Sequence, residues 1–295
     1  MTPSPDGVRN YNRYISLCLL LAVSVALWWQ AIVSTLRLAL NNDAYTHILL
    51  IVPLSLSLIF FESRHDPVMA EPRRETGAVL LGIALSLFGL ASWNASNLSS
   101  DWRLSISMFA LVAWWIGSAI VCLGLSALRS LLFPLCLLFL SVPLPGRFVD
   151  SATQFLQHQS TVASEILFRA AHVPVTRHGI ILSIPALDIE VARECSSIRS
   201  STMLMVITLI LAHLFLRSSW RKILLVVAAI PLSVAKNAVR IFTIAELGTR
   251  VDPGYLNGRL HHNGGIVFLG LAVFVDVALL WILRRGSIEL RGLEC

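Results

Sequence analysis

The sequence has little charge. Only 14% of its 295 residues are Asp, Glu, Lys or Arg, whereas 56% are hydrophobic and the mean hydropathy is +0.75. Several apolar runs approach the roughly 20 residues that a helix needs to cross a bilayer. No extramembrane stretch is long enough to build a soluble core, the longest being residues 148–194. The composition therefore excludes a soluble enzyme and predicts an integral membrane protein.

Large basic patches are also missing, although the net charge is +6. Lys and Arg occur singly or in small groups at the ends of apolar runs, which is how basic residues mark cytoplasmic loops. Proteins that bind nucleic acid instead gather basic residues on one face. We therefore expect no nucleic-acid partner.

Cysteines are few and odd in number. Three of the five, Cys18, Cys122 and Cys136, lie inside apolar runs, where a thiol packs as a small hydrophobe. This spacing indicates no disulfide framework. Cys195 alone has polar neighbours at a predicted membrane boundary, a setting that favours a reactive thiolate.

The apolar runs predict about eight transmembrane helices. Basic residues near the N-terminus, at Arg217–Lys222 and at Arg284–Arg285 place both termini in the cytoplasm, because positive loops stay inside. We expect an all-α membrane protein in which residues 1–295 form a single multi-spanning domain. The predicted spans are residues 15–34, 48–61, 77–93, 104–127, 130–141, 197–216, 223–245 and 264–283.

The connector at residues 148–194 is predicted to lie outside the cytoplasm. Its first half has apolar residues at helical spacing, among them Phe155, Ile166 and Leu167, which predicts an amphipathic helix on the bilayer surface. The stretch from His178 to Val191 is rich in β-branched residues and alternates, which predicts a short β-hairpin. The hairpin would deliver the chain to Cys195.

Cys195 is the candidate nucleophile. Ser196 and Ser197, which follow it, are good helix N-cap residues, so the thiol would lie at the positive end of a helix dipole that favours the thiolate. A lone cysteine at a helix start is nevertheless more often a packing residue. By the count of crossings, Cys195 faces the extracytoplasmic space.

A second candidate group lies within the predicted span 223–245. Lys236, Asn237 and Arg240 fall on roughly one helix face, since they are separated by one and three residues. A guanidinium inside a span costs a few kcal/mol unless it is paired or wet, so Arg240 is a site candidate by default. The competing interpretation is that Arg240 only snorkels to lipid head groups.

The third candidate is the pair His261 and His262, at the outer end of the last predicted span. A histidine can take the proton of a thiol and return one to a leaving amine, while Arg240 stabilises a tetrahedral intermediate. Together with Cys195 these residues describe acyl transfer through an acyl-enzyme. The pair could also be an ordinary loop, or contact a metal, but no third ligand lies at suitable spacing and we expect neither metal nor cofactor.

These segments resemble the exosortase and archaeosortase family. The resemblance rests on the segments Glu194–Arg199 (Glu-Cys-Ser-Ser-Ile-Arg), Asn237–Ile241 (Asn-Ala-Val-Arg-Ile) and His261–Phe268 (His-His-Asn-Gly-Gly-Ile-Val-Phe). Asp43–His47 (Asp-Ala-Tyr-Thr-His) and a Val-Pro-Leu-Pro stretch that ends at Pro145 support it. One departure is Ser197, which stands where the family usually has glycine.

The resemblance implies a membrane transpeptidase or thiol protease. Its substrates would be exported proteins with C-terminal sorting signals of PEP-CTERM type, cut at the outer face of a bacterial inner membrane, often alongside exopolysaccharide production. Cys195 would be the nucleophile, Arg240 the oxyanion or positioning group, and His261 or His262 the acid and base. Lys236, Asn237 and Ser196 would then contact the substrate.

Two other functions remain open from the sequence. The first is a membrane transporter or a protein that handles lipid-linked polymers, with Arg240 and Lys236 binding an anionic substrate within the membrane. The second is a structural or assembly subunit in which Cys195 is incidental. Membrane lipid is a partner in every case, and the sequence sets no oligomeric state.

Overall fold

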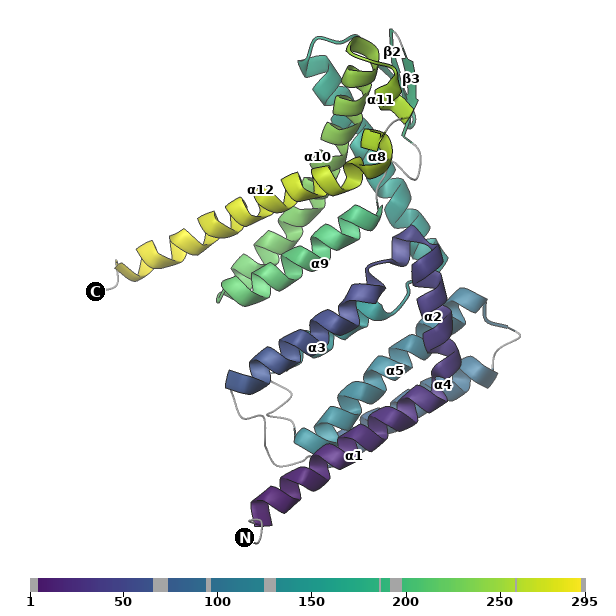
Figure 1. Cartoon of the computed structure of the whole chain (residues 1–295), viewed down its shortest axis with the longest axis vertical. Coiled ribbons are helices and arrows are strands. Elements are labelled where there is room, and N and C mark those ends of the chain that lie inside the picture. The colour runs from purple at the N-terminus through teal and green to yellow at the C-terminus, as the bar shows by residue number, and fades with distance from the viewer. Residues whose placement is uncertain are drawn as a thin grey trace. The chain divides into compact units, whose positions relative to one another are not determined.

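Helices dominate the computed structural model, which describes residues 5–65, 74–93, 97–124, 131–185, 187–191, 198–257 and 259–292. Side chains are described over the same ranges, except at residues 5–10, 64–65, 256–264 and 286–292. The chain divides into two compact units, residues 1–146 and 147–295 (Figure 1). The single domain expected from the sequence stays a prediction.

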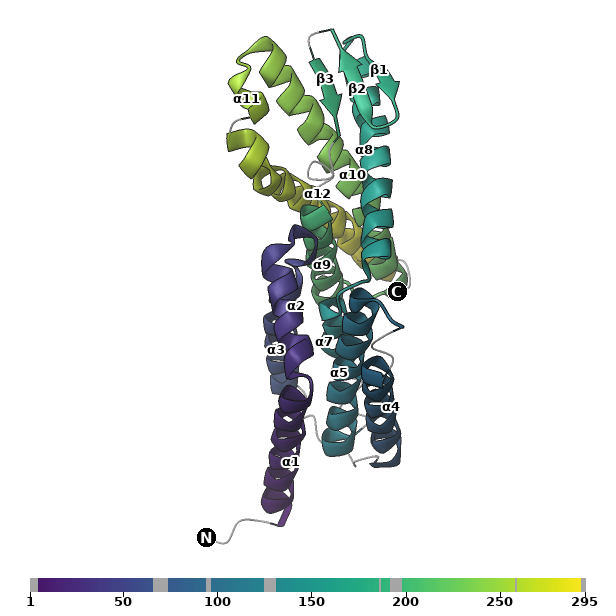
Figure 2. The same cartoon turned by 90° about the vertical axis from the view of Figure 1, so that its right-hand side faces the viewer.

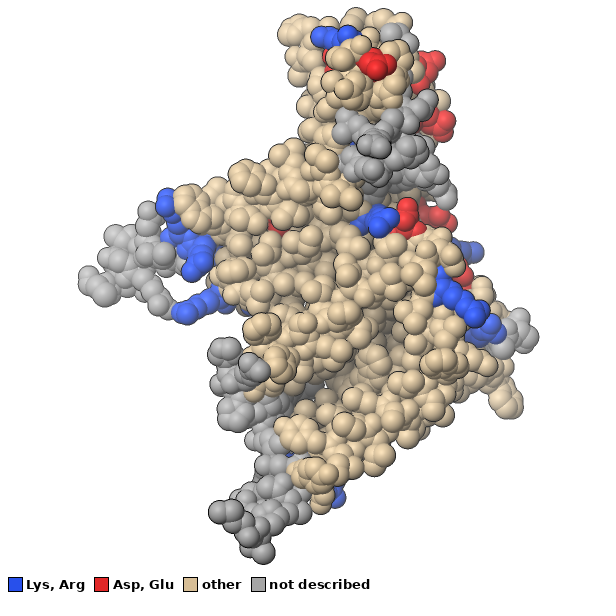
Figure 3. All heavy atoms as spheres, in the orientation of Figure 1, with Lys and Arg blue, Asp and Glu red and all other residues tan. Residues whose placement is uncertain are grey.

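Six helices are long and apolar enough to cross a membrane, or up to eight if each of two bent helix pairs counts as one span. This result confirms the predicted all-α membrane protein with about eight spans. On the face drawn in Figure 3, charged side chains gather at the helix ends, while the long sides of the helices are mostly uncharged. The six unbent candidates are residues 43–63, 74–93, 100–123, 198–215, 219–250 and 265–285.

The first unit is built around one central helix. It contains α1 (Pro5–Leu27), α2 (Trp29–Asn41), the 3₁₀ turn η1 (Asp43–Tyr45), α3 (Ile48–His65), α4 (Arg74–Trp93), α5 (Ser100–Leu123), α7 (Leu132–Leu137) and the 3₁₀ turn η2 (Leu138–Ser141). Two thirds of the apolar window of α5 is buried, far more than in any other candidate span. It packs against α4, α1, α2 and η2.

The first predicted span is bent. Instead of running straight through residues 15–34, the chain turns by 71° between α1 and α2. Trp28 sits at the bend, is fully buried, and has its ring 4.7 Å from that of Phe88 and 5.7 Å from that of Trp114. Burial of this large ring against α4 and α5 holds the bend in place.

The fifth predicted span is a short, broken helix. Its regular part comprises the six residues of α7 and the four of η2, too few to cross a bilayer as a helix. Residues 143–144, which follow it, nevertheless lie close to the N-terminal end of α5. Ser105 donates a hydrogen bond of 2.5 Å to the carbonyl of Pro143, and the Tyr45 hydroxyl donates one of 2.8 Å to that of Leu144. Leu131, Leu135 and Leu138 are buried on one side of this path, where they pack with Val112 of α5.

The second unit combines a helix bundle with a small sheet. It contains α8 (Gly146–Ala170), strands β1 (Thr176–His178), β2 (Ile181–Ile184) and β3 (Leu187–Glu190), and helices α9 (Ile198–Phe215), α10 (Ser219–Arg250), α11 (Gly254–Asn257) and α12 (Arg259–Gly292). Helices α9, α10 and α12 pack against one another. The sheet lies beside α8 (Figure 2).

The predicted hairpin is part of a three-stranded antiparallel sheet in the order β1-β2-β3. Leu182 at the centre of β2 pairs with Arg177 and Ile189, is fully buried, and packs with Phe168 and Ala245. Gly179 in the first turn has a φ of +66°, which favours glycine. The third strand escaped prediction because β1 is exposed along its whole length and carries no apolar alternation.

Helix α8 is the predicted amphipathic helix. Phe148, Phe155 and Ile166 are exposed on its outer face. Its inner face is polar, with Gln157, Ser160 and Ser164 all buried. Phe168 is buried against the sheet, whereas Phe148, Phe155 and Ile166 point away from the unit, which suits a surface that contacts lipid.

Candidate functional site

Helix α10 positions three of the predicted site residues. Lys236, Asn237 and Arg240 lie within its apolar, 32-residue length and have exposed fractions of only 5%, 1% and 8%. Their burial confirms that they share an inward face. Arg240 therefore does not extend along the outside of its unit, as the snorkelling interpretation requires.

Hydrogen bonds join this face of α10 to the first turns of α9. The Lys236 ammonium donates to the hydroxyl of Ser200, and Ser233 donates to the hydroxyl of Ser201 over 2.5 Å. Ser200 and Ser201 follow the predicted Cys195 segment directly in sequence, yet they were not among the predicted site residues. They could have been predicted from their place, because they are polar residues in the first turn of the apolar helix α9, as its third and fourth residues.

The charge of this face is its main chemical property. Lys236 and Arg240 are one helical turn apart, an arrangement in which like charges repel. Burying two such cations costs free energy unless polar groups or an anionic partner compensate for the lost water. The face can therefore stabilise negative charge that develops on a bound group.

The predicted nucleophile lies between Val191 and Ile198, which are the nearest residues that the structure describes. On one side, Val191 is fully buried and its carbonyl accepts a hydrogen bond of 2.6 Å from Gln157 of α8. On the other side, α9 begins at Ile198. Cys195 and Ser196 lie outside the described residues, as does Ser197, so their assignment stays a prediction.

His261 and His262 fall within the first turn of α12, which starts at Arg259 and not at the predicted residue 264. Their side chains lie outside the described residues. Among the described side chains, no three His, Cys, Asp or Glu residues could hold a metal ion, a finding that covers neither Cys195 nor the two histidines. The catalytic role of either histidine stays a prediction.

A comparison with protein families shows which family this chain belongs to. The profile described as transmembrane exosortase (Exosortase_EpsH) matches residues 28–278, most of the chain. This chain belongs to the transmembrane exosortase family. No curated protein and no solved structure matches it.

The match to the exosortase family confirms the resemblance seen in the sequence. It starts at the bend between α1 and α2 and ends within α12, so it includes every predicted site residue. The family supports a role as a membrane transpeptidase or protease. The structure adds a contact for the Asp43–His47 segment of this resemblance, because the Tyr45 hydroxyl donates a hydrogen bond to the carbonyl of Leu144.

One buried acid of this exosortase was missed in the sequence. Asp276 of α12 is fully buried, and Thr208 of α9 donates a hydrogen bond of 2.9 Å to its Oδ2. Its Oδ1 has no hydrogen-bond partner among the described residues. The signal was present, since Asp276 interrupts the apolar run between Gly265 and Leu283 and an acid inside a span is a functional candidate by default.

Proposed function

We propose that this exosortase cleaves the C-terminal sorting signals, of PEP-CTERM type, of exported proteins through a cysteine acyl-enzyme. The observation that carries the proposal is the buried cationic face of α10, tied to the start of α9 by the bond from Lys236 to Ser200. Three residues of chain span no more than about 11 Å, which limits the distance of Cys195 from Ile198. The proposed nucleophile therefore belongs near the end of α9 that contacts Lys236.

The reaction would begin with attack of the Cys195 thiolate on the peptide carbonyl carbon. His261 or His262 takes the thiol proton, and the carbonyl oxygen becomes an oxyanion that Arg240 stabilises. When the intermediate collapses, the C–N bond breaks and the histidine gives its proton to the leaving amine. The product is a thioester between Cys195 and the exported protein.

A second nucleophile would then release the protein. Water gives hydrolysis, whereas an amine or hydroxyl of an acceptor gives transfer, and in both cases the thiolate leaves and the histidine accepts the proton of the nucleophile. Lys236, Asn237 and Ser196 would hold the peptide near Arg240. We place the site on the extracytoplasmic side, where an exported protein arrives.

The proposal is tested by mass spectrometry of an exported protein with a Pro-Glu-Pro type C-terminal signal, expressed together with this chain. The wild type is expected to produce a new C-terminus, and Cys195→Ala, Arg240→Ala and one of His261→Ala and His262→Ala are expected to abolish it. Cys122→Ala is the matched control, because Cys122 is buried in α5 of the other unit. Processing that persists without Cys195 would refute the acyl-enzyme and favour the transporter.

Lys236 offers a finer test of the same site. Lys236→Met removes the charge and the bond to Ser200 but keeps the length of the side chain. If Lys236 holds the peptide, processing should slow mainly at low substrate levels, by about tenfold for a lost charge-assisted hydrogen bond. Ser200→Ala, which removes only the intramolecular partner, should slow it less. Equal losses in both variants would assign Lys236 a structural role.

A further inference from the structure

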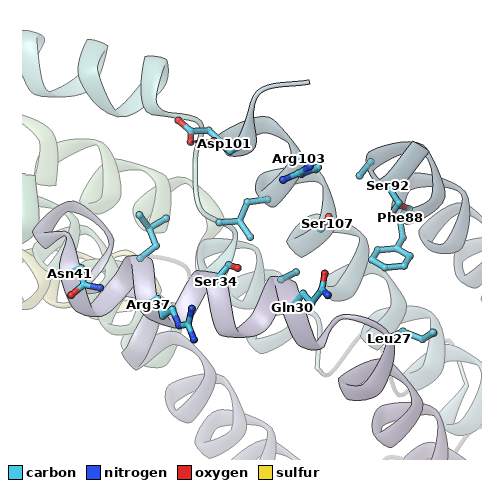
Figure 4. Close-up of a pocket in the computed structure, with 15 residues that line it drawn as sticks. Leu27, Gln30, Ser34, Arg37, Asn41, Phe88, Ser92, Asp101, Arg103 and Ser107 are labelled. Carbon is cyan, nitrogen blue, oxygen red and sulfur yellow. Dashed lines mark hydrogen bonds between the residues drawn. The ribbon is translucent and has the colours of Figure 1, made fainter. Parts of the chain in front are cut away.

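The first unit contains a groove that the proposed reaction does not use. It has a volume of about 790 Å³ and lies between α2, the C-terminal end of α4 and the N-terminal end of α5 (Figure 4). All of its lining residues belong to the first unit. The groove is therefore a separate site from the cationic face of α10.

Polar residues from α2 line one wall of the groove. Gln30, Ser34, Arg37 and Asn41 recur every three or four residues, so they form one stripe along the helix. Leu36 and Leu40 of the same helix are exposed away from this stripe. Helix α2 is thus amphipathic, and its 71° bend from the long apolar helix α1 suits a helix at a membrane surface.

The groove combines apolar and cationic lining. Leu27 and Phe88 line it near the bend, Arg37 lines it farther along α2, and Arg103 of α5 lies across from the Gln30 part of α2 (Figure 4). Asp101 is the only acid in the lining, so the groove carries a net positive charge. An amphiphile with an anionic head and an apolar tail matches this mixed lining.

The guanidinium groups of Arg37 and Arg103 can donate hydrogen bonds to a ligand. Both side chains are exposed, and within the described ranges neither makes an ion pair or hydrogen bond. Asp101 instead accepts a hydrogen bond of 3.4 Å from Ser100. A guanidinium binds the oxygens of a phosphate through parallel N–H donors, so each of these arginines can bind a phosphate that enters the groove.

We propose that this groove binds one anionic phospholipid, with its headgroup attracted by Arg37 and Arg103 and its acyl chains along Leu27, Ala31 and Phe88. The net positive charge of the lining favours a headgroup without an amine over a zwitterionic one. A free phosphate would use the arginines but leave the apolar end empty. This proposal does not depend on the proposed peptidase activity, because it concerns binding alone.

Native mass spectrometry of the full chain in a non-ionic detergent tests the proposal. The probes are phosphatidylglycerol, phosphatidylcholine with the same acyl chains, and inorganic phosphate. The test variant is Arg37→Gln with Arg103→Gln. The control is Arg13→Gln with Arg74→Gln, which removes two charges from the same unit, about 14 or more residues or ~20 Å along α1 and α4 from the groove.

We expect one saturable phosphatidylglycerol per wild-type chain and weaker binding of phosphatidylcholine. Each arginine near the surface should contribute about fivefold to the affinity, so the test variant should lose about twenty-five-fold while the control keeps its affinity. Equal losses in the two variants would overturn the proposal in favour of diffuse charge attraction. Competition by inorganic phosphate at the same affinity would overturn it in favour of a phosphate site, and absence of bound lipid would overturn it outright.

Discussion

At the scale of single residues, burial separates the candidates more sharply than residue type does. Lys236, Asn237 and Arg240 were singled out because polar groups interrupt an apolar run, and the structure buries all of them on one face. Asp276 carries the same signal and was missed, because the expected chemistry needed a thiol, a base and a cation and gave an acid no role. An ionisable residue inside a span is a functional candidate by default, and this holds for Asp276 as much as for Arg240.

Asp276 allows a test of whether its role is structural. Asp276→Asn keeps an oxygen that can accept the hydrogen bond from Thr208, so the free energy of unfolding should change by less than about 0.6 kcal/mol, the mean for such bonds between membrane helices. Asp276→Ala removes the acceptor and leaves a cavity, and should cost about 1–3 kcal/mol. Unfolding by sodium dodecyl sulfate in mixed micelles measures both changes.

Peptide processing separates the structural role of Asp276 from a chemical one. If the carboxyl only ties α12 to α9, Asp276→Asn should process substrate as the wild type does, and Thr208→Val, which loses the bond without leaving a cavity, should cost less stability than Asp276→Ala. A variant Asp276→Asn that is stable but inactive would contradict the structural role and add an acid to the site.

At the scale of elements, the close approach of α4 and α5 depends on glycine. A Cβ atom built on Gly77 would lie 2.9 Å from the backbone nitrogen of Val121 and 3.0 Å from the carbonyl oxygen of Gly117, which are backbone atoms that cannot turn away. Small residues of this kind let membrane helices pack closely. This contact supports α5 as the centre of the first unit.

Gly77→Ala is therefore expected to destabilise the first unit by about 1–3 kcal/mol, because α4 must move away from α5. Gly82→Ala and Gly89→Ala are matched controls on the same helix, since a Cβ at either position meets nothing within 4 Å. They should be neutral or stabilising by up to about 1 kcal/mol, from helix propensity. Similar losses at all three positions in thermal unfolding would refute the packing argument.

Much of the secondary structure followed from the sequence, because apolar runs and helical periodicity are local signals. The bend at Trp28 and the contact of Pro143 with α5 did not, since each depends on residues far away in sequence, such as Trp114 and Ser105. For the site, the sequence predicted the α10 face but not its partners Ser200 and Ser201. A hydrogen bond across 36 residues leaves no local pattern.

At the scale of the whole molecule, the segment between Gly124 and Pro143 decides on which side of the membrane the cysteine lies. Helix α5 ends at Leu123, and the bond from Ser105 to Pro143 brings the chain back to the opposite end of that helix. Among the described residues of this return, α7 and η2 supply ten helical residues. If it crosses the membrane, α9 starts on the side opposite to the end of α5, and Cys195 with it.

Alkaline phosphatase fusions, which are active only outside the cytoplasm, test this topology. Fusions after Pro145 and Arg250 should be active, whereas those after Gly124, Phe215 and Arg285 should be inactive, because basic residues keep the latter ends inside. The pair at Gly124 and Pro145 is decisive. Equal activity at these two positions would mean that the chain does not cross the membrane between them, which would put Cys195 in the cytoplasm, where it could not meet an exported protein.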